Sequence, residues 1–282
     1  MTTPINPTSL ALPSGRLAPG RRPPMSTLER LVAVTGHHAL VYRRTWRATI
    51  IERLLAPLLF LVSVGFGVGG LVDSGAGGIQ GMSYLHYVAP GLTAMQAMWL
   101  AFGESTYIVM SYIRWNQMYS AMLASPLSVV EVLAGHLLVV ALHLVGATTV
   151  FVVVGAVFGA YTSWWAVLLV PAATATGMAF SLPLFALAAT TPDDSGFGTV
   201  NRLLLAPLLM VSGVFFPVAS LPALLQPIAW VSPMYHGTEL CRAAATGTGS
   251  FSGLLPHALV LLVWLAVGWV LARRQFTKRL VP

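Results

Sequence analysis

The sequence predicts an all-α integral membrane protein with six transmembrane helices and both termini in the cytoplasm. Of its 282 residues, 56% are hydrophobic and only 8% are charged, whereas about 25% of the residues of a typical soluble domain are charged. The mean hydropathy is +0.78. The apolar residues form stretches close to the roughly 20 residues that a helix needs to cross a bilayer, and the basic residues between those stretches indicate their orientation.

Six apolar stretches are bounded by charged or turn residues, and each is a candidate span. They cover residues 54–72, 88–113, 133–159, 164–189, 203–218 and 254–272. With the N-terminus inside, fourteen of the fifteen basic residues fall in cytoplasmic segments and only Arg242 lies outside. This asymmetry follows the positive-inside rule and predicts a multi-pass protein of the cell (cytoplasmic) membrane.

The segments that flank the spans differ in character. Residues 1–26 are rich in Pro and Arg and show no hydrophobic periodicity, so we expect a disordered tail. Residues 27–53 interleave apolar and arginine residues, which predicts an amphipathic helix on the cytoplasmic face, either a basic anchor for the first span or a docking surface for a partner. The transmembrane domain then covers 54–272, and residues 273–282 form a basic cytoplasmic tail.

Two segments between the spans have structure of their own. In the inner loop 114–128, apolar residues at helical spacing predict a short helix across the membrane surface that ends at Ser125 and Pro126, and a new helix that begins near Ser128 with Glu131 in its first turn. Such a surface helix can pass force between a soluble partner and two spans. The outer region 219–253 begins with an apolar stretch that prolines break and that is about half a span long, which predicts a re-entrant or interfacial element before the last span.

A few polar residues inside the predicted spans need an explanation. Glu104 lies in the second span, where an unpaired charge is costly; it either lines a translocation path or gate, or makes a structural hydrogen bond to a neighbouring helix. His136 and His143 share one face of the third span, but no carboxylate or further histidine there completes a metal site. Asp193 and Asp194 lie in a short cytoplasmic turn, where we expect them to be solvated and to cap the next helix.

Several classes of function are disfavoured. The arginines cluster near the two ends and make no stripe that could follow a nucleic-acid backbone. Because Lys278 in the tail is the only lysine, the chain cannot contain a Walker A motif, so any ATP that drives it must bind another subunit. Catalytic motifs such as HExxH and GxSxG are also missing from the sequence, which predicts no catalytic residue, no metal site and no cofactor bound by this chain.

Three blocks of residues resemble the permease subunits of type 2 ABC exporters, especially the branch of the nodulation-factor lipo-oligosaccharide exporters and the actinobacterial drug-resistance permeases. The first block runs from Glu104 through the inner loop and contains Arg114, Gln117, Met118, Tyr119, Ala121, Met122, Leu123, Ser125, Pro126 and Glu131. The second is similar to the family's SG.FFP…LP motif and contains Ser212, Gly213, Phe215, Phe216, Pro217, Leu221 and Pro222. The third is similar to its P..H...L.R element and contains Pro233, His236, Leu240 and Arg242. His136 departs from the pattern, because an acidic residue is expected there.

The resemblance implies a function and a set of partners. The inner loop would be the coupling helix that fits a cleft in a cytoplasmic ABC ATPase, which binds ATP and Mg. Two copies, or this chain and a homologous permease, would form the path for an amphipathic substrate: a lipid-linked oligosaccharide, a membrane lipid or a hydrophobic drug, as in antibiotic resistance. Replacing Tyr119 or Met122 by Asp is expected to uncouple transport without loss of membrane insertion.

Two further interpretations stay open. Phe215 and Phe216 beside Pro217 are candidates for an outer hydrophobic gate, or for ordinary packing at the interface. The competing class of function is a stand-alone membrane protein, either a proton-coupled secondary transporter using Glu104 or a polytopic membrane enzyme. The two halves of the chain are not alike, which disfavours the inverted or parallel repeats of secondary transporters.

Overall fold

The computed structural model describes residues 26, 28–30, 32, 34–36 and 58–281, and the regular structure of these residues is helical. A first helical run, 58–76, contains the π-helical segment Ser63–Val68 and α2 (Gly69–Ala76). It is followed by α3 (Tyr84–Ser105), α4 (Tyr107–Met110) with the π-helical Ser111–Trp115, α5 (Met118–Leu123), α6 (Val129–Val157) and α7 (Leu169–Thr190), which a 3-10 turn at Trp164–Leu168 precedes. The last helices are α8 (Ser195–Val200), α9 (Ala206–Val211), α10 (Gln226–Val231), α11 (Pro233–Thr246) and α12 (Phe251–Leu280).

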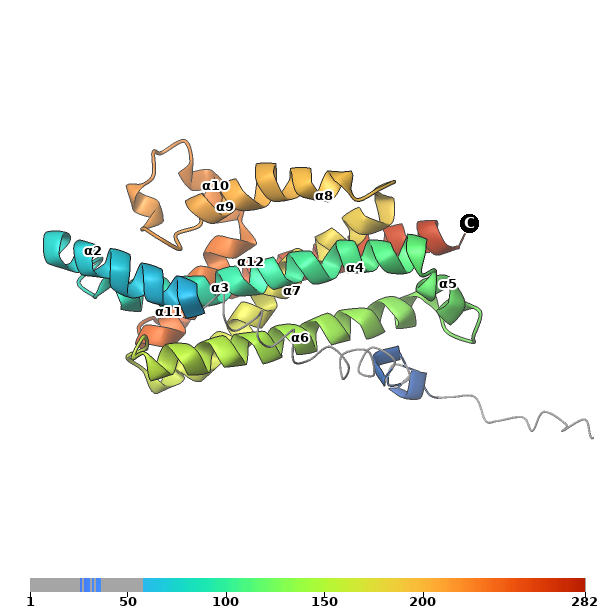
Figure 1. Ribbon diagram of the computed structural model, residues 1–282, viewed down its shortest axis with the longest axis horizontal. Coiled ribbons are helices and arrows are strands. Elements are labelled where there is room, and N and C mark those ends of the chain that lie inside the picture. Colours follow the sequence, from blue (N-terminus) through green and yellow to red (C-terminus); the bar gives the residue numbers. More distant parts are fainter. Residues whose placement is uncertain (1–25, 27, 31, 33, 37–57, 282) are drawn as a thin grey trace, which may run out of the picture.

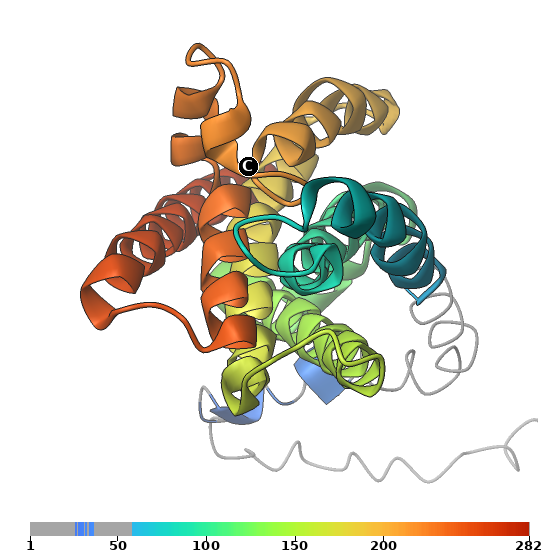
Figure 2. The same cartoon turned by 90° about the vertical axis from the view of Figure 1, so that its left-hand side faces the viewer.

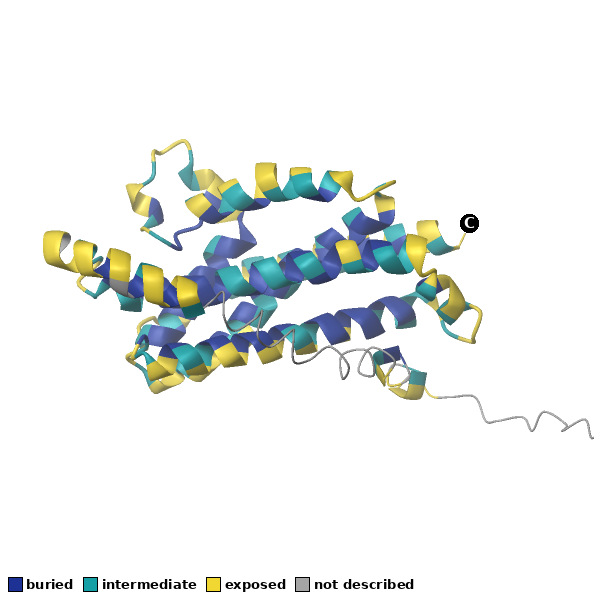
Figure 3. Ribbon diagram, in the orientation of Figure 1, coloured by how far each residue is buried: buried dark blue, intermediate teal, exposed yellow. Residues whose placement is uncertain are grey.

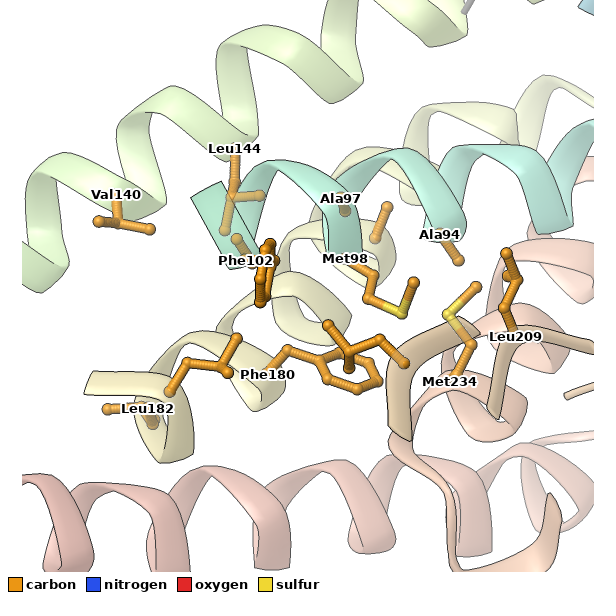
Figure 4. Close-up of a cluster of buried hydrophobic side chains, with 14 of the residues drawn as sticks. Ala94, Ala97, Met98, Phe102, Val140, Leu144, Phe180, Leu182, Leu209 and Met234 are labelled. Atoms are coloured by element: carbon orange, nitrogen blue, oxygen red, sulfur yellow. The ribbon is translucent and has the colours of Figure 1, made fainter. Parts of the chain in front are cut away.

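The helices form an elongated bundle around α7 (Figure 1). This helix packs against α3, α6, α11 and α12, and its middle is buried. A close-up of the core shows Met98 of α3 facing Met234 of α11, with Phe180 of α7 to one side of them and Leu144 of α6 beside Phe102 (Figure 4). Exposed residues gather at the ends and on the outer faces of the bundle (Figure 3), and many of them are large apolar side chains, as expected for a surface that faces lipid or another subunit.

The two ends of the bundle carry different segments. α5 and the C-terminus lie at one end, whereas α10, α11 and the C-terminal end of α2 lie at the other (Figure 1). The segments that the sequence predicts to be cytoplasmic and those that it predicts to be outside thus lie at opposite ends.

Four of the predicted spans are long and apolar enough to cross a membrane, judged on the described residues. They are Leu58–Gly75, Val129–Val157, Trp164–Thr190 and Phe251–Leu280. The expected second span, 88–113, corresponds to α3 and α4, whose helix is interrupted at Thr106. The expected fifth span, 203–218, is displaced toward the N-terminus, because the apolar helical run is Ser195–Val211 and ends before Gly213, whose φ of +74° is left-handed. The six-span topology therefore stays a prediction.

The outer region 219–253 contains more regular structure than expected. After a 3-10 turn at Val218–Ser220 and the short α10, α11 crosses the end of the bundle obliquely and packs against α3, α7 and α12 (Figure 2). Gly247, with φ +70°, ends α11, and the Ser250 side chain caps α12. The buried α11 is the main element of this region, and its re-entry from the membrane surface stays a prediction.

The flanking segments are described only in part. α12 continues to Leu280, so most of the expected basic tail is the last part of a long helix. Near the N-terminus, residues 28–30, 32 and 34–36 are helical and Val34 is buried, close enough to α6 that a Cβ at Gly135 would meet its side chain at 2.5 Å. The rest of the predicted amphipathic helix and all of residues 1–25 lie outside the described residues.

Candidate functional site

The short helix predicted in the inner loop is present as α5. Gln117, directly before it, has a left-handed backbone with φ 46° and ψ 31°, which turns the chain away from the helical run that ends at Trp115. Ser128 then starts α6 with a capping box, in which its Oγ accepts from the Glu131 N–H (3.3 Å) and its N–H donates to Glu131 Oε2 (2.8 Å). These two devices make α5 a separate short helix between two long ones, and they confirm the predicted break and restart.

The side chains of the inner loop fall into three groups by exposure. Arg114, Gln117, Ser125 and Pro126 are exposed, and Met118, Met122 and Leu123 are half-buried. Tyr119 is completely buried. The first two groups can contact a partner, whereas Tyr119 cannot. Because Asp at Tyr119 would bury a carboxylate among aromatic rings, the structure does not support the expectation that this change would spare the protein.

Tyr119 packs into a cluster of five rings at the inner end of the bundle. Its ring centroid lies 5.7 Å from that of Tyr112, 5.9 Å from His136 and 5.5 Å from Phe276, and Phe185 closes the cluster against His136 and Phe276 at 5.1 and 5.8 Å. Tyr119 Oη forms a hydrogen bond of 2.5 Å with His136 Nδ1. The rings come from five different elements, so the sequence pattern of a single element carries no signal for this cluster.

Glu131 joins the inner loop to the N-terminal segment. Besides the capping box, its Oε1 lies 3.2 Å from Arg30 Nη1. The Arg30 side chain is 29% exposed and the Glu131 side chain is 12% exposed, so solvent screens the ion pair only in part. The sequence assigns Glu131 to the coupling loop, and the structure shows contacts through which it holds this loop, α6 and the segment around Arg30 together.

Glu104 is buried and faces α6. His143 Nδ1 lies 3.0 Å from its Oε1, and their side chains are 9% and 19% exposed for Glu104 and His143. The sequence places His143 on one face of its helix with no carboxylate in the same span, and the structure supplies that carboxylate from α3. Glu104 therefore has the hydrogen bond to a neighbouring helix that was one of its two interpretations, while a role in a path or gate is untested.

At the outer end, the SG.FFP block and the P..H...L.R block meet. The Gly213 carbonyl accepts hydrogen bonds from Arg242 Nη2 (2.7 Å) and from Tyr87 Oη (3.2 Å). The Arg242 guanidinium lies 4.0 Å from the centroid of the Tyr87 ring and forms an ion pair with Glu239. These contacts join the end of α9 to α11 and α3, and sequence reasoning missed Tyr87, which carries no motif.

The residues of the expected outer gate have different environments. Phe215 is half-buried and its ring lies 6.4 Å from that of Phe60 in the first helical run. Phe216 is 36% exposed, and Pro217 is half-buried. Phe215 thus makes an ordinary aromatic contact within the chain, and Phe216 is the more accessible of the two rings.

Two histidines face each other where α11 and α12 meet. Pro233 is the first residue of α11, and Ser232 caps that helix by accepting from the Met234 N–H at 3.1 Å. His236 Nε2 donates to the Trp230 carbonyl (2.7 Å), and its Nδ1 lies 2.8 Å from Nδ1 of His257. His236 thus holds α10 and α12 against α11, a role whose partners could not be read from the sequence. Among the described residues, no group of three or more His, Cys, Asp and Glu is arranged to hold a metal ion.

Asp193 and Asp194 are both exposed in the turn before α8, as expected, but only Asp193 caps the helix, because the Asp194 side chain makes no capping hydrogen bond. Asp193 Oδ1 accepts hydrogen bonds from the Ser195 hydroxyl (2.5 Å) and from the Ser195 N–H (3.0 Å). These bonds lower the pKa of the Asp193 carboxyl, and the positive charge of Arg114 acts in the same direction. The carboxylate therefore stays ionised and helps α8 to start at Ser195.

Comparisons with known proteins show which family and which relatives this chain resembles. A family model described as ABC-2 type transporter matches residues 29–245. Nodulation protein J of Rhizobium leguminosarum bv. viciae is 29% identical over 251 residues, which cover 89% of this chain and 95% of the relative. Nodulation protein J of Rhizobium meliloti (strain 1021) is 28% identical over 252 residues, which cover 89% of this chain and 94% of the relative. The inner membrane transport permease YadH of Escherichia coli (strain K12) is 25% identical over 204 residues, 69% of this chain and 74% of the relative.

Proposed function

The chain belongs to the ABC-2 type transporter family, and from this premise we propose that it is the membrane-spanning permease subunit of an ATP-driven exporter. It is a multi-pass protein of the cell membrane. The observation that supports the proposal is α5, a short helix with exposed residues after a sharp turn at one end of the bundle, in the loop for which the family resemblance implies a coupling helix.

ATP binding and hydrolysis belong to a separate subunit. The only lysine, Lys278, lies in the last turn of α12, and a P-loop requires a lysine that reaches the phosphates of the nucleotide. The cytoplasmic ABC ATPase would bind the exposed side of α5, where Arg114, Gln117, Ser125 and Pro126 are accessible. This chain itself contributes no catalytic group. Its two conformations interact differently with the ATPase, so a change in the nucleotide state of the ATPase shifts the permease from one conformation to the other.

The proposed topology has six spans with both ends of the chain inside. In this arrangement, α5 and the C-terminal turns of α12 with Arg273, Arg274, Lys278 and Arg279 face the cytoplasm, as the positive-inside rule favours. The outer end then carries α10 and α11. Two copies, or one copy and a homologous permease, would enclose the path, and the exposed apolar faces of the bundle supply surfaces for such an association.

The proposed substrate is amphipathic. Only 8% of the residues are charged. Glu104 in the second predicted span is engaged by His143, and Arg242 at the outer end is engaged by Glu239. A path with so few free charges suits a lipid, a lipid-linked oligosaccharide or a hydrophobic drug better than a highly charged solute. The resemblance to the nodulation-factor lipo-oligosaccharide exporters favours the lipid-linked oligosaccharide among these, and the similarity to Nodulation protein J agrees with that branch of the family.

Affinity purification of the tagged chain from its native membrane in mild detergent tests the proposal. A P-loop ATPase recovered at equal stoichiometry is the expected result. Recovery of a pure homo-oligomer would contradict the exporter function and would favour a secondary transporter that uses the Glu104–His143 pair for protons.

A matched pair of variants tests whether α5 makes the contact. Ala121 is exposed on α5, and Leu224 is 85% exposed at the opposite end. Ala121→Arg should release the ATPase because a bulky side chain prevents α5 from entering a cleft, while Leu224→Arg should leave the complex intact. Retention of the ATPase by both variants would exclude α5 as the docking helix.

A further inference from the structure

The orientation of α5 depends on very few contacts. The helix has six residues, too few to be stable by itself in water, and its one buried side chain is that of Tyr119. Its other residues are half-buried or exposed. The way in which Tyr119 is held therefore determines which face α5 turns to a partner.

The Tyr119 side chain is held by its ring and by its hydroxyl group in different ways. The centroids of the Tyr112, His136 and Phe276 rings lie 5.5 to 5.9 Å from the centroid of the Tyr119 ring. Those of Tyr112 and His136 lie 5.4 Å from each other. Edge contacts between rings tolerate sliding, whereas a hydrogen bond fixes one atom at one distance and angle. The 2.5 Å bond from Tyr119 Oη to His136 Nδ1 thus determines how deeply the ring enters the cluster.

The hydrogen bond between Tyr119 and His136 is costly to break. Tyr119 is completely buried and His136 is 2% exposed, so water cannot replace either partner when the two groups separate. A buried polar group that loses its partner is unfavourable. Tyr119 and His136 are therefore expected to stay together while the rest of the molecule moves.

The cluster also links α5 to three long helices. His136 lies in the second turn of α6, Phe185 in the last turns of α7 and Phe276 in the last turns of α12. A displacement of α5 moves the Tyr119 ring. The bond to His136 passes that displacement to α6, and the packing of His136 on Phe185 and of Tyr119 on Phe276 extends it to α7 and α12.

We propose that His136 is a positioning residue that fixes α5 through Tyr119, so that movement imposed on α5 by the ATPase reaches the bundle. This inference rests on the proposed function, since it assumes that the ATPase binds α5. His136 itself touches neither nucleotide nor substrate. The family resemblance implies an acidic residue at this position. The histidine that stands there instead binds the hydroxyl group of Tyr119.

The chain offers a label for the test. Its single cysteine, Cys241, is buried, so a Leu224→Cys substitution at the exposed outer end introduces the one accessible thiol. The complex of permease and ATPase in membrane vesicles is treated with a maleimide in ADP and in ATP with vanadate. The ratio of the two labelling rates measures how far the nucleotide state of the ATPase is transmitted to the outer end.

Two single variants remove the bond while keeping most of the packing. Tyr119→Phe and His136→Leu are each expected to keep the ATPase bound and to decrease the nucleotide-dependent change in labelling roughly fivefold, the effect of about one net hydrogen bond on a two-state equilibrium. The double variant should show no further decrease, because both changes remove the same interaction. His136→Asn, which keeps an acceptor near the Nδ1 position, should restore the response.

The control is Tyr161→Phe, which removes a hydroxyl from a tyrosine at the opposite end, between α6 and α7, and should leave the response unchanged. Normal nucleotide-dependent labelling in both Tyr119→Phe and His136→Leu would overturn the inference alone. Absence of the ATPase from the unsubstituted complex would overturn the proposed function and the inference with it. Equal losses in Tyr119→Phe and Tyr161→Phe would indicate a general loss of stability and would also overturn it.

Discussion

Arg242 is predicted to be the most important polar side chain for the stability of the outer end. Replacing it by Ala removes the 2.7 Å hydrogen bond to the Gly213 carbonyl, the contact with the Tyr87 ring and the ion pair with Glu239. A hydrogen bond from a charged group contributes about 1.5–3 kcal/mol, and a buried cation–π contact contributes about 0.5–2 kcal/mol. Because Glu239 is 31% exposed, solvent screens its pair with Arg242 and we assign little to it.

The free energy of unfolding of Arg242→Ala should therefore fall by about 3 kcal/mol. At roughly 2–4 °C per kcal/mol, the midpoint of thermal unfolding in detergent should fall by about 6–12 °C, as measured by tryptophan fluorescence. Arg279→Ala, an exposed arginine at the other end, is the matched control and should leave the midpoint unchanged. Tyr87→Phe removes only the weaker 3.2 Å bond to Gly213 and should have a smaller effect. An Arg242→Ala midpoint equal to that of the control would refute this explanation of the outer end.

Two further predictions concern helix contacts. Gly237 in α11 lies so close to α7 that an added Cβ would overlap Thr176, so Gly237→Ala should decrease the free energy of unfolding by about 1–3 kcal/mol. Gly146 has open space around it, so Gly146→Ala should increase the free energy of unfolding by up to about 1 kcal/mol. Equal thermal midpoints for the two variants would contradict the close approach of α11 to α7. Glu131→Ala should decrease the free energy of unfolding by about 1–2 kcal/mol because it removes the capping box and the pair with Arg30, whereas Glu131→Gln keeps the cap and should lose at most about 1 kcal/mol; thermal midpoints of the two variants separate these contributions.

The long apolar helices were predictable because composition alone determines them. α6 and α7 have no charged residue apart from Glu131 in the first turn of α6, so the limits of the apolar stretch nearly coincide with the limits of the helix. The break at α5 was also predictable, because Ser128 and Glu131 have the spacing of a capping box. Each of these features depends on neighbours within a few residues along the chain.

The fifth span shows where this reasoning is insufficient. The sequence predicts that it starts at Leu203, directly after the charged Arg202, but the helical run begins at Ser195, where Asp193 accepts two hydrogen bonds from Ser195. It ends before Gly213, whose carbonyl is held by Arg242 from α11. The left-handed Gly213 is itself a local stop signal, whereas the contact that holds its carbonyl joins residues 29 positions apart and is not contained in a local pattern.

The polar pairs inside the bundle follow a rule that joins sequence and packing. A hydrophobic environment makes each unpaired charge or buried hydrogen-bonding group costly, so Glu104 in an apolar helix must face either a water-filled path or a partner on a neighbouring helix. The identity of that partner, His143, depends on how α3 and α6 are rotated about their axes, and a sequence with so few charges carries no second signal for that rotation. The partner of His136 could not be identified from the sequence either, because the resemblance assigns Tyr119 to the loop that contacts the ATPase, whereas the structure buries Tyr119 against His136. In an apolar chain, a buried ionisable residue therefore predicts that a contact exists, and only the packing of the helices determines with which residue.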